Sequence, residues 1–206
     1  MGIKQKIFSI VARQFRRPSG FFGWLAGWEM ALNRGNRKRN AWAVSLVDPR
    51  ADARVLEIGF GPGIAVRELA KRVTAGKVYG VDHSETMRRF ASKRNTEAVA
   101  AGRVDLRVGS ADDLPEFGER FDLVLTVNSL QFWPEPTERL KEIRRLLGTA
   151  GRIAIVSQPR CPGATADTTK VTAEEIVQRL AESGYTVVCR ETLDLSPPAV
   201  CVIGAV

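Results

Sequence analysis

Three glycines at alternate positions follow a glutamate in the segment EIGFGPG, residues 57–63. Glycine lets the backbone turn sharply and lets a ligand approach with no Cβ in the way. A helix that begins after such a loop presents free N–H groups and a positive dipole end to an anion. The carboxylate of Glu57 suits a cationic amine instead. The segment therefore predicts a site for a small ligand that carries charges of both signs.

A second acid, Asp82, closes the next predicted strand. At such a strand end a carboxylate can accept hydrogen bonds from both hydroxyls of a ribose, as it does in dinucleotide-binding folds. The alternative is that Asp82 only caps the helix that follows it. With the glycine loop, Asp82 favours a ligand that contains a nucleoside.

The elements that must position these residues alternate between strand and helix patterns from about residue 50. This alternation predicts an α/β fold, with a parallel sheet covered on both faces. The segment between the last two strands is too short for a helical crossover, so these strands should pair antiparallel. We expect seven strands, at 54–58, 77–81, 104–108, 121–127, 152–157, 185–190 and 199–206. We expect helices at 64–73, 84–100, 137–147 and 172–183.

Local signals mark several ends of these elements. Ser84 is a plausible N-cap, and Gly148 follows the helix expected at 137–147. Residues 158–170 contain proline, glycine and threonine and are expected to form a loop. Thr172 and Glu175 have the spacing of a capping box at the start of the next helix.

An oxidoreductase that binds NAD(P) is the first alternative for the glycine loop. Its fingerprint needs a glycine or alanine three positions after the middle glycine, where the helix packs on the strand. Here that position is Ile64, preceded by Pro62 and Gly63. The expected antiparallel pair at the end of the chain also differs from a doubly wound dehydrogenase, so both features disfavour NAD(P).

Four segments resemble, in order and at the usual intervals, the motifs of the class I methyltransferases that use S-adenosylmethionine (SAM). They are VLEIGFGPG (55–63), VYGVDHSETM (78–87), VGSADDLPEF (108–117) and FDLVLTVNSLQFW (121–133). GRIAIV (151–156) is similar to the family's fifth strand. The resemblance implies a Rossmann-like three-layer sandwich, with a mostly parallel sheet whose last strand is antiparallel. It also implies methyl transfer from SAM to a small-molecule or lipid-like acceptor, with S-adenosylhomocysteine as the product.

The resemblance implies the following cofactor contacts. Glu57, Gly59, Phe60, Gly61 and Gly63 would surround the methionine part. Asp82 would hold the ribose, with His83 and Met87 beside the ribose and adenine. Ser110, Ala111 and Asp112 would face the adenine, and Asn128 would lie near the sulfonium and its methyl group. Ser110 departs from the family, which often has an acid there.

No residue is assigned as a catalytic base, because methyl transfer from a sulfonium needs one only if the nucleophile must lose a proton. Trp24, Trp28, Gln131 and Trp133 are the candidate substrate contacts. The chain has one histidine and three cysteines without metal-ligand spacing, so no metal is expected. A protein of this fold that binds SAM without methylating remains an alternative. The Asn/Asp-Pro-Pro-aromatic motif of enzymes that methylate nucleobase amines or glutamine is absent.

The net charge of +8 lies entirely in residues 1–40, which hold nine basic residues and one acid. We therefore expect an N-terminal helical, basic and aromatic arm (1–45) before a SAM-binding methyltransferase domain (46–206). Three roles for the arm compete: a lid over the cofactor site, attachment of residues 1–20 to an anionic membrane, and nucleic-acid binding, which is the least favoured. No signal peptide or membrane span is recognisable, so we expect a cytoplasmic protein, with peripheral membrane attachment as the alternative.

Overall fold

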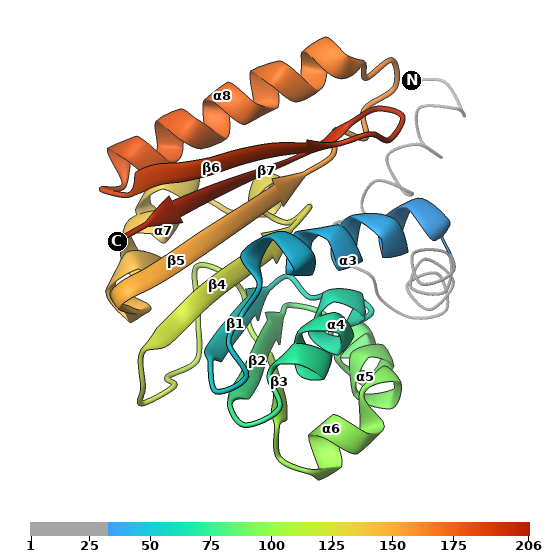
Figure 1. The fold of residues 1–206 in the computed structure, drawn as a ribbon, viewed down its shortest axis with the longest axis vertical. Coiled ribbons are helices and arrows are strands. Elements are labelled where there is room, and N and C mark those ends of the chain that lie inside the picture. Colours follow the sequence, from blue (N-terminus) through green and yellow to red (C-terminus); the bar gives the residue numbers. More distant parts are fainter. Residues whose placement is uncertain (1–32) are drawn as a thin grey trace, which may run out of the picture.

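The computed structural model describes residues 33–206, which form one seven-stranded sheet between two layers of helices (Figure 1). The strands are β1 (Arg54–Ile58), β2 (Lys77–Asp82), β3 (Val104–Val108), β4 (Phe121–Val127), β5 (Leu147–Ser157), β6 (Thr186–Leu193) and β7 (Ala199–Ala205). The helices are α3 (Arg34–Val47), α4 (Ile64–Arg72), α5 (Glu85–Arg94), α6 (Thr96–Ala100), α7 (Pro136–Leu146), α8 (Ala166–Glu182) and the short 3₁₀ helix η1 (Leu130–Phe132).

The strand order is β3-β2-β1-β4-β5-β7-β6. Strands β1 to β5 pair in parallel, whereas β7 runs antiparallel to both of its neighbours, β5 and β6. This arrangement confirms the predicted mostly parallel sheet with an antiparallel last strand. It also brings the carboxyl ends of β1 to β5 to one edge, which is where open α/β sheets bind their ligands.

Side chains from alternate positions of the strands fill a separate core on each face of the sheet. Helices α3 to α6 pack on one face and α7 and α8 on the other. In β4, Leu123 and Leu125 face the first core and Val124 the second, and all three are at most 2% exposed. The nearly continuous apolar run of β4 therefore reflects a central strand buried on both faces, as predicted.

Helix α3 crosses the boundary at residue 45 that we expected between arm and domain. Its Ala43, Val44 and Val47 are buried in the same core as α4, so this helix packs as part of the body. Asn33 caps it, since the Asn33 side chain accepts a hydrogen bond from the Asn36 N–H at 3.0 Å. Trp24, Trp28 and the rest of the expected arm before residue 33 lie outside the described residues.

The expected start of the last helix was wrong. Helix α8 begins at Ala166, within the expected loop, and its capping box pairs Thr165 with Thr168 at N···O distances of 3.1 and 3.4 Å. The hydroxyl of Thr172 instead donates to the carbonyl of Thr168 within the helix, at 3.0 Å. Four threonines between residues 165 and 172 offered several possible caps, and the first of them, Thr165, is the N-cap.

Two further boundaries differ from expectation. The helix expected at 84–100 divides at Asn95, whose side-chain amide donates to the carbonyl of Ala91 at 2.8 Å and to that of Gly63 at 3.3 Å. Helix α7 ends at Leu146 and β5 starts at once, so Gly148 lies in the strand instead of capping the helix.

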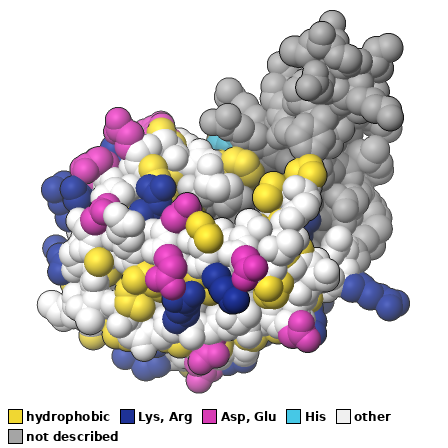
Figure 2. Space-filling view, turned by 90° about the horizontal axis from the view of Figure 1, so that it is seen from above, with side chains coloured by type: hydrophobic (Ala, Val, Ile, Leu, Met, Phe, Trp, Pro, Cys, Tyr) yellow, Lys and Arg dark blue, Asp and Glu magenta, His cyan; other side chains and the backbone are white. Residues whose placement is uncertain are grey.

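The face of the molecule in Figure 2 carries interspersed acidic and basic side chains, with hydrophobic side chains in small separate patches. Exposed ion pairs join neighbouring elements or turns, as between Arg190 and Glu174 (2.6 Å) and between Lys170 and Asp167 (3.0 Å). Within residues 33–206, no helix is both long and apolar enough to span a membrane.

Candidate active site

The glycine loop between β1 and α4 is held closely against two other elements. A Cβ on Gly59 would lie 2.2 Å from Ser129 Oγ, and one on Gly63 would lie 2.6 Å from the Cβ of Ala91 in α5. Gly63 has a φ of +74° and is the N-cap of α4. Packing therefore excludes a side chain at both positions, independently of any ligand.

Gly61 differs from these two glycines. It also has positive φ, +52°, but a Cβ built on it would meet no atom of residues 33–206 within 4 Å. Its N–H donates to Asp82 Oδ2 at 2.8 Å. The ring of Phe60, by contrast, is buried against Gly80 of β2. The open space at Gly61 is what a loop that admits a ligand against its backbone requires.

Asp82 lies at the end of β2 and is 5% exposed. Its two oxygens accept from the N–H groups of Gly61 (2.8 Å) and Ser84 (2.9 Å), and His83 Nδ1 lies 3.6 Å from Oδ1. Burial raises the pKa of Asp82, and the two backbone hydrogen bonds oppose this rise. Ser84, as predicted, is the N-cap of α5: its hydroxyl accepts from the Met87 N–H at 3.3 Å. Asp82 therefore does more than cap a helix, because it also holds the glycine loop.

Glu57, on β1, is 1% exposed, and its Oε2 has no hydrogen-bond partner within residues 33–206. Burial raises the pKa of Glu57 well above its usual value, the charge of Asp82 raises it further, and a hydrogen bond from the Val66 N–H lowers it. A buried carboxyl with an unpaired oxygen is costly. A cationic group at this oxygen would offset that cost.

The segment after β3 lies beside Asp82, because Val108 pairs with Asp82 in the sheet and the Gly109 N–H donates to the Asp82 carbonyl at 3.1 Å. A hydrogen bond from the side chain of Ser110 lowers the pKa of the neighbouring Asp112 carboxyl. Ala111 is 6% exposed and packs in the core. A polar pair, Ser110 and Asp112, thus flanks a buried alanine next to the predicted ribose site.

Asn128 joins the ends of β4 and β5. Its N–H donates to the Val156 carbonyl (2.8 Å), and its Oδ1 accepts from the Gln158 N–H (2.7 Å). Its φ is +53°, a left-handed conformation that asparagine tolerates better than most residues. The side chain of Gln131 donates to the Asn128 carbonyl at 2.9 Å. These contacts fix the backbone where the methyl group is expected.

The structure brings most of the predicted cofactor residues to the shared edge of β1 to β4. These are Glu57, Gly59, Gly61, Gly63, Asp82, His83, Ser110, Ala111, Asp112 and Asn128. The side chains of Phe60, Met87 and Trp133 lie in the hydrophobic cores instead. Trp133 is 8% exposed and donates to Ser129 Oγ at 2.9 Å, so it supports the residue that packs on Gly59.

Sequence reasoning missed the residues that anchor the glycine loop from α5. Arg94 donates to the Pro62 carbonyl at 2.7 Å, and Asn95 donates to that of Gly63. Both stand at the end of a polar helix segment, where arginine and asparagine usually face solvent. No signal in the sequence distinguishes them. In the part of the chain that is described, no three His, Cys, Asp or Glu side chains are grouped to hold a metal ion.

Comparison with known proteins places this chain in a family. The family model described as "Methyltransferase domain" matches residues 55–151. The uncharacterized methyltransferase YdaC of Bacillus subtilis is 30% identical over 161 residues, which are 78% of this chain and 86% of YdaC. A demethylmenaquinone methyltransferase of Lactiplantibacillus plantarum is 31% identical over 161 residues, which are 77% of this chain and 64% of that enzyme.

Solved structures show the same fold. A SAM-dependent methyltransferase from Aquifex aeolicus superposes with a TM-score of 0.67 at 19% identity, over 82% of this chain and 90% of that one. The solved structure shows the fold, and the relatives above show the family: the chain belongs to the class I SAM-dependent methyltransferases. The protein is a methyltransferase enzyme, and this reading is favoured over the NAD(P) oxidoreductase.

Proposed function

We propose that this methyltransferase binds SAM at the carboxyl ends of β1 to β4 and transfers its methyl group to a small-molecule or lipid-like acceptor. The observation that carries the proposal is the pairing of two features in one loop. Among the residues that the structure describes, the buried Glu57 Oε2 has no hydrogen-bond partner, and a Cβ on Gly61 would contact no atom within 4 Å. A small ligand that carries a cationic amine would satisfy both features.

Each acidic residue has a distinct role in this proposal. Glu57 accepts from the ammonium of the methionine part, and this contact stabilises the ionised carboxylate. Asp82 accepts from the ribose hydroxyls, using lone pairs that its contacts with Gly61 and Ser84 leave available. Ser110, Ala111 and Asp112 face the adenine, with His83 beside the nucleoside.

Bound SAM supplies a methyl group on a sulfonium, which is an excellent leaving group. The chain contributes mainly orientation and the exclusion of water. Asn128, held by the ends of β4 and β5, fixes the backbone beside the proposed path of transfer. His83 follows β2, which β1 separates from β4, so it lies roughly 10 Å to the side of Asn128. We therefore assign His83 to the nucleoside and not to proton transfer.

The acceptor is proposed to lie beyond Asn128 and Gln131, on the side of β5. The name of the L. plantarum relative gives demethylmenaquinone as its acceptor, which supports a small or lipid-like molecule. The test is incubation of the protein with methyl-labelled SAM and fractionated metabolite and lipid extracts. We expect label in one acceptor and an equal amount of S-adenosylhomocysteine. SAM binding without either product, across all fractions, would favour the non-methylating alternative.

A further inference from the structure

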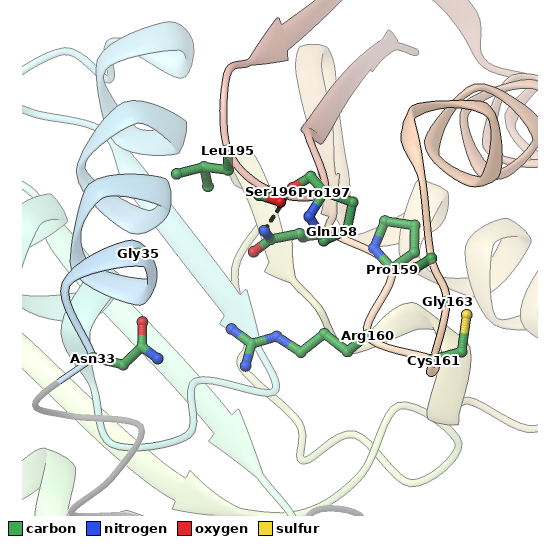
Figure 3. Close-up of a pocket in the computed structure, with 11 residues that line it drawn as sticks. Asn33, Gly35, Gln158, Pro159, Arg160, Cys161, Gly163, Leu195, Ser196 and Pro197 are labelled. Atoms are coloured by element: carbon green, nitrogen blue, oxygen red, sulfur yellow. Dashed lines mark hydrogen bonds between the residues drawn. The ribbon is translucent and has the colours of Figure 1, made fainter.

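A cavity of about 450 Å³ lies between the start of α3, the loop after β5 and the β6–β7 connection (Figure 3). Its lining includes Asn33 and Gly35 of α3, Gln158 and Arg160 after β5, and Ser196. Among residues 33–206, no lining residue is acidic, and Arg160 is the one that carries a formal charge. The cavity is therefore polar and locally basic.

Arg160 points across this cavity toward the first turn of α3 (Figure 3). There the helix dipole is positive, and the first N–H groups of a helix have no acceptor within it. No acid within residues 33–206 forms an ion pair with Arg160, although most of the ion pairs there involve other arginines. A guanidinium and a helix start thus face the same space, and no acid of the described residues pairs with this guanidinium.

A second guanidinium, that of Arg39, lies behind the wall of the cavity. Arg39 is only 3% exposed, and it too has no ion pair with an acid in the described part of the chain. It donates to Gln158 Oε1 at 2.5 Å and to Asn36, while its Nε has no hydrogen-bond partner among the described residues. Burial, and then the charge of Arg160, lower the pKa of Arg39 to about 10. The two arginines are therefore close enough to repel each other.

Gln158 connects this basic cavity to the methyl end of the proposed SAM site. Its backbone N–H donates to Asn128 Oδ1 (2.7 Å), while its side chain accepts from Arg39 and donates to the Pro197 carbonyl (2.8 Å). One residue thus contacts Asn128 through its backbone and lines the cavity with its side chain. A molecule bound in the cavity would lie next to the carboxyl ends of β4 and β5.

We infer that this cavity binds an anionic oxygen group, a carboxylate or a phosphate, that the methyl acceptor carries. The inference rests on the proposed function for the identity of the ligand as acceptor. An anion between Arg160 and the start of α3 would pair the exposed guanidinium and offset the repulsion between the two arginines. The acceptor is thereby narrowed to an acidic small molecule, or to a lipid or metabolite with a phosphate group.

The test measures the binding of three matched probes to the full chain saturated with S-adenosylhomocysteine. The probes are benzoate, phenyl phosphate and neutral benzamide. Affinity is read by calorimetry and by protection of Cys161, an exposed free thiol in the lining, from alkylation. The variants are Arg160→Gln, the charge-conserving Arg160→Lys, and the control Arg50→Gln, whose exposed side chain pairs with Asp52 before β1.

We expect at least one anion to bind more tightly than benzamide and to protect Cys161. Arg160→Gln should weaken the binding of that anion by about tenfold or more. Arg160→Lys should retain most of the affinity, and Arg50→Gln should leave it unchanged. The anion that binds more tightly shows whether the acceptor's group is a carboxylate or a phosphate. Equal binding of all three probes, or unchanged anion affinity in Arg160→Gln, would overturn the inference. Failure of the wild type to bind S-adenosylhomocysteine would instead contradict the proposed function, since probe binding can also be measured without it.

Discussion

The carboxylate of Asp82 ties the end of β2 to the glycine loop, because its Oδ2 accepts the N–H of Gly61 at 2.8 Å. Its other oxygen accepts the N–H of Ser84 at the start of α5. A single buried side chain therefore sets the relative positions of the two loops that are proposed to hold the two ends of the cofactor. Substitutions in either loop should affect binding more than stability wherever packing is not disturbed.

The open space at Gly61 can be tested by Gly61→Ala. An alanine at a φ of +52° is strained, and the cost is about 1–2 kcal/mol. Because the new methyl group meets no atom of the described part of the chain within 4 Å, it should project into the space proposed for the ligand. We expect S-adenosylhomocysteine to bind at least about tenfold more weakly, as measured by calorimetry.

Gly102→Ala is the matched control. Gly102 has a φ of +71°, and a Cβ built on it equally meets no atom of residues 33–206 within 4 Å, but it precedes β3, away from the site. Gly102→Ala should lower the melting temperature about as much as Gly61→Ala does, and it should leave the affinity for S-adenosylhomocysteine unchanged. Equal affinity in the two variants would refute a ligand at Gly61. Gly63→Ala should be the least stable, because its Cβ would lie 2.8 Å from the backbone of Ala91.

The raised pKa of Glu57 predicts a pH dependence of stability. The folded state holds this proton more tightly than the unfolded chain, whose carboxyl has a pKa near 4.5. The stabilisation that the protonated Glu57 gives the folded state is therefore fully present below pH 4.5 and is lost as the pH rises toward the folded pKa. Glu57→Gln removes this loss, so the ligand-free variant should be more stable than the wild type at pH 8.

Urea unfolding of both proteins between pH 5 and pH 8 measures this difference. The same variant should bind SAM more weakly, since the amide cannot pair with the ammonium as a carboxylate does. Stability curves that stay parallel across this pH range would show that Glu57 is not the titrating group.

Deletion of residues 1–20 distinguishes a lid over the cofactor site from a segment that attaches to a membrane. Deleting them should abolish sedimentation with anionic liposomes if that segment binds the membrane, because its basic residues each contribute around 1 kcal/mol near such a surface. If it is a lid, the truncated chain should keep its SAM affinity and lose turnover. Equal sedimentation of both forms, or none of either, would exclude the membrane role.

The positions of the strands, and the sheet edge at which the proposed site residues gather, could be predicted from the sequence. Buried parallel strands are apolar runs, and the proposed site residues lie at or just after the ends of such runs. Glu57, Asp82 and Asn128 were found in this way. Arg39, Arg94 and Asn95 were not, since their partners are distant in the chain: Gln158 is 119 positions from Arg39. Arg39 stands in a segment that reads as solvent-exposed, and only the packing of α3 on the body shows that it is buried.

The proposed SAM site at Asp82 is tested by calorimetric titration of SAM into the wild type and Asp82→Ala. We predict that the wild type binds SAM and does not bind NAD. Asp82→Ala should weaken the binding of SAM by about tenfold or more, because the contacts of Asp82 to both the ribose and Gly61 are lost. The Asp52→Ala variant, which removes an exposed carboxylate before β1, serves as the control and should bind as the wild type does. No binding of SAM to the wild type, or an equal affinity for SAM in Asp82→Ala, would contradict the proposed SAM site.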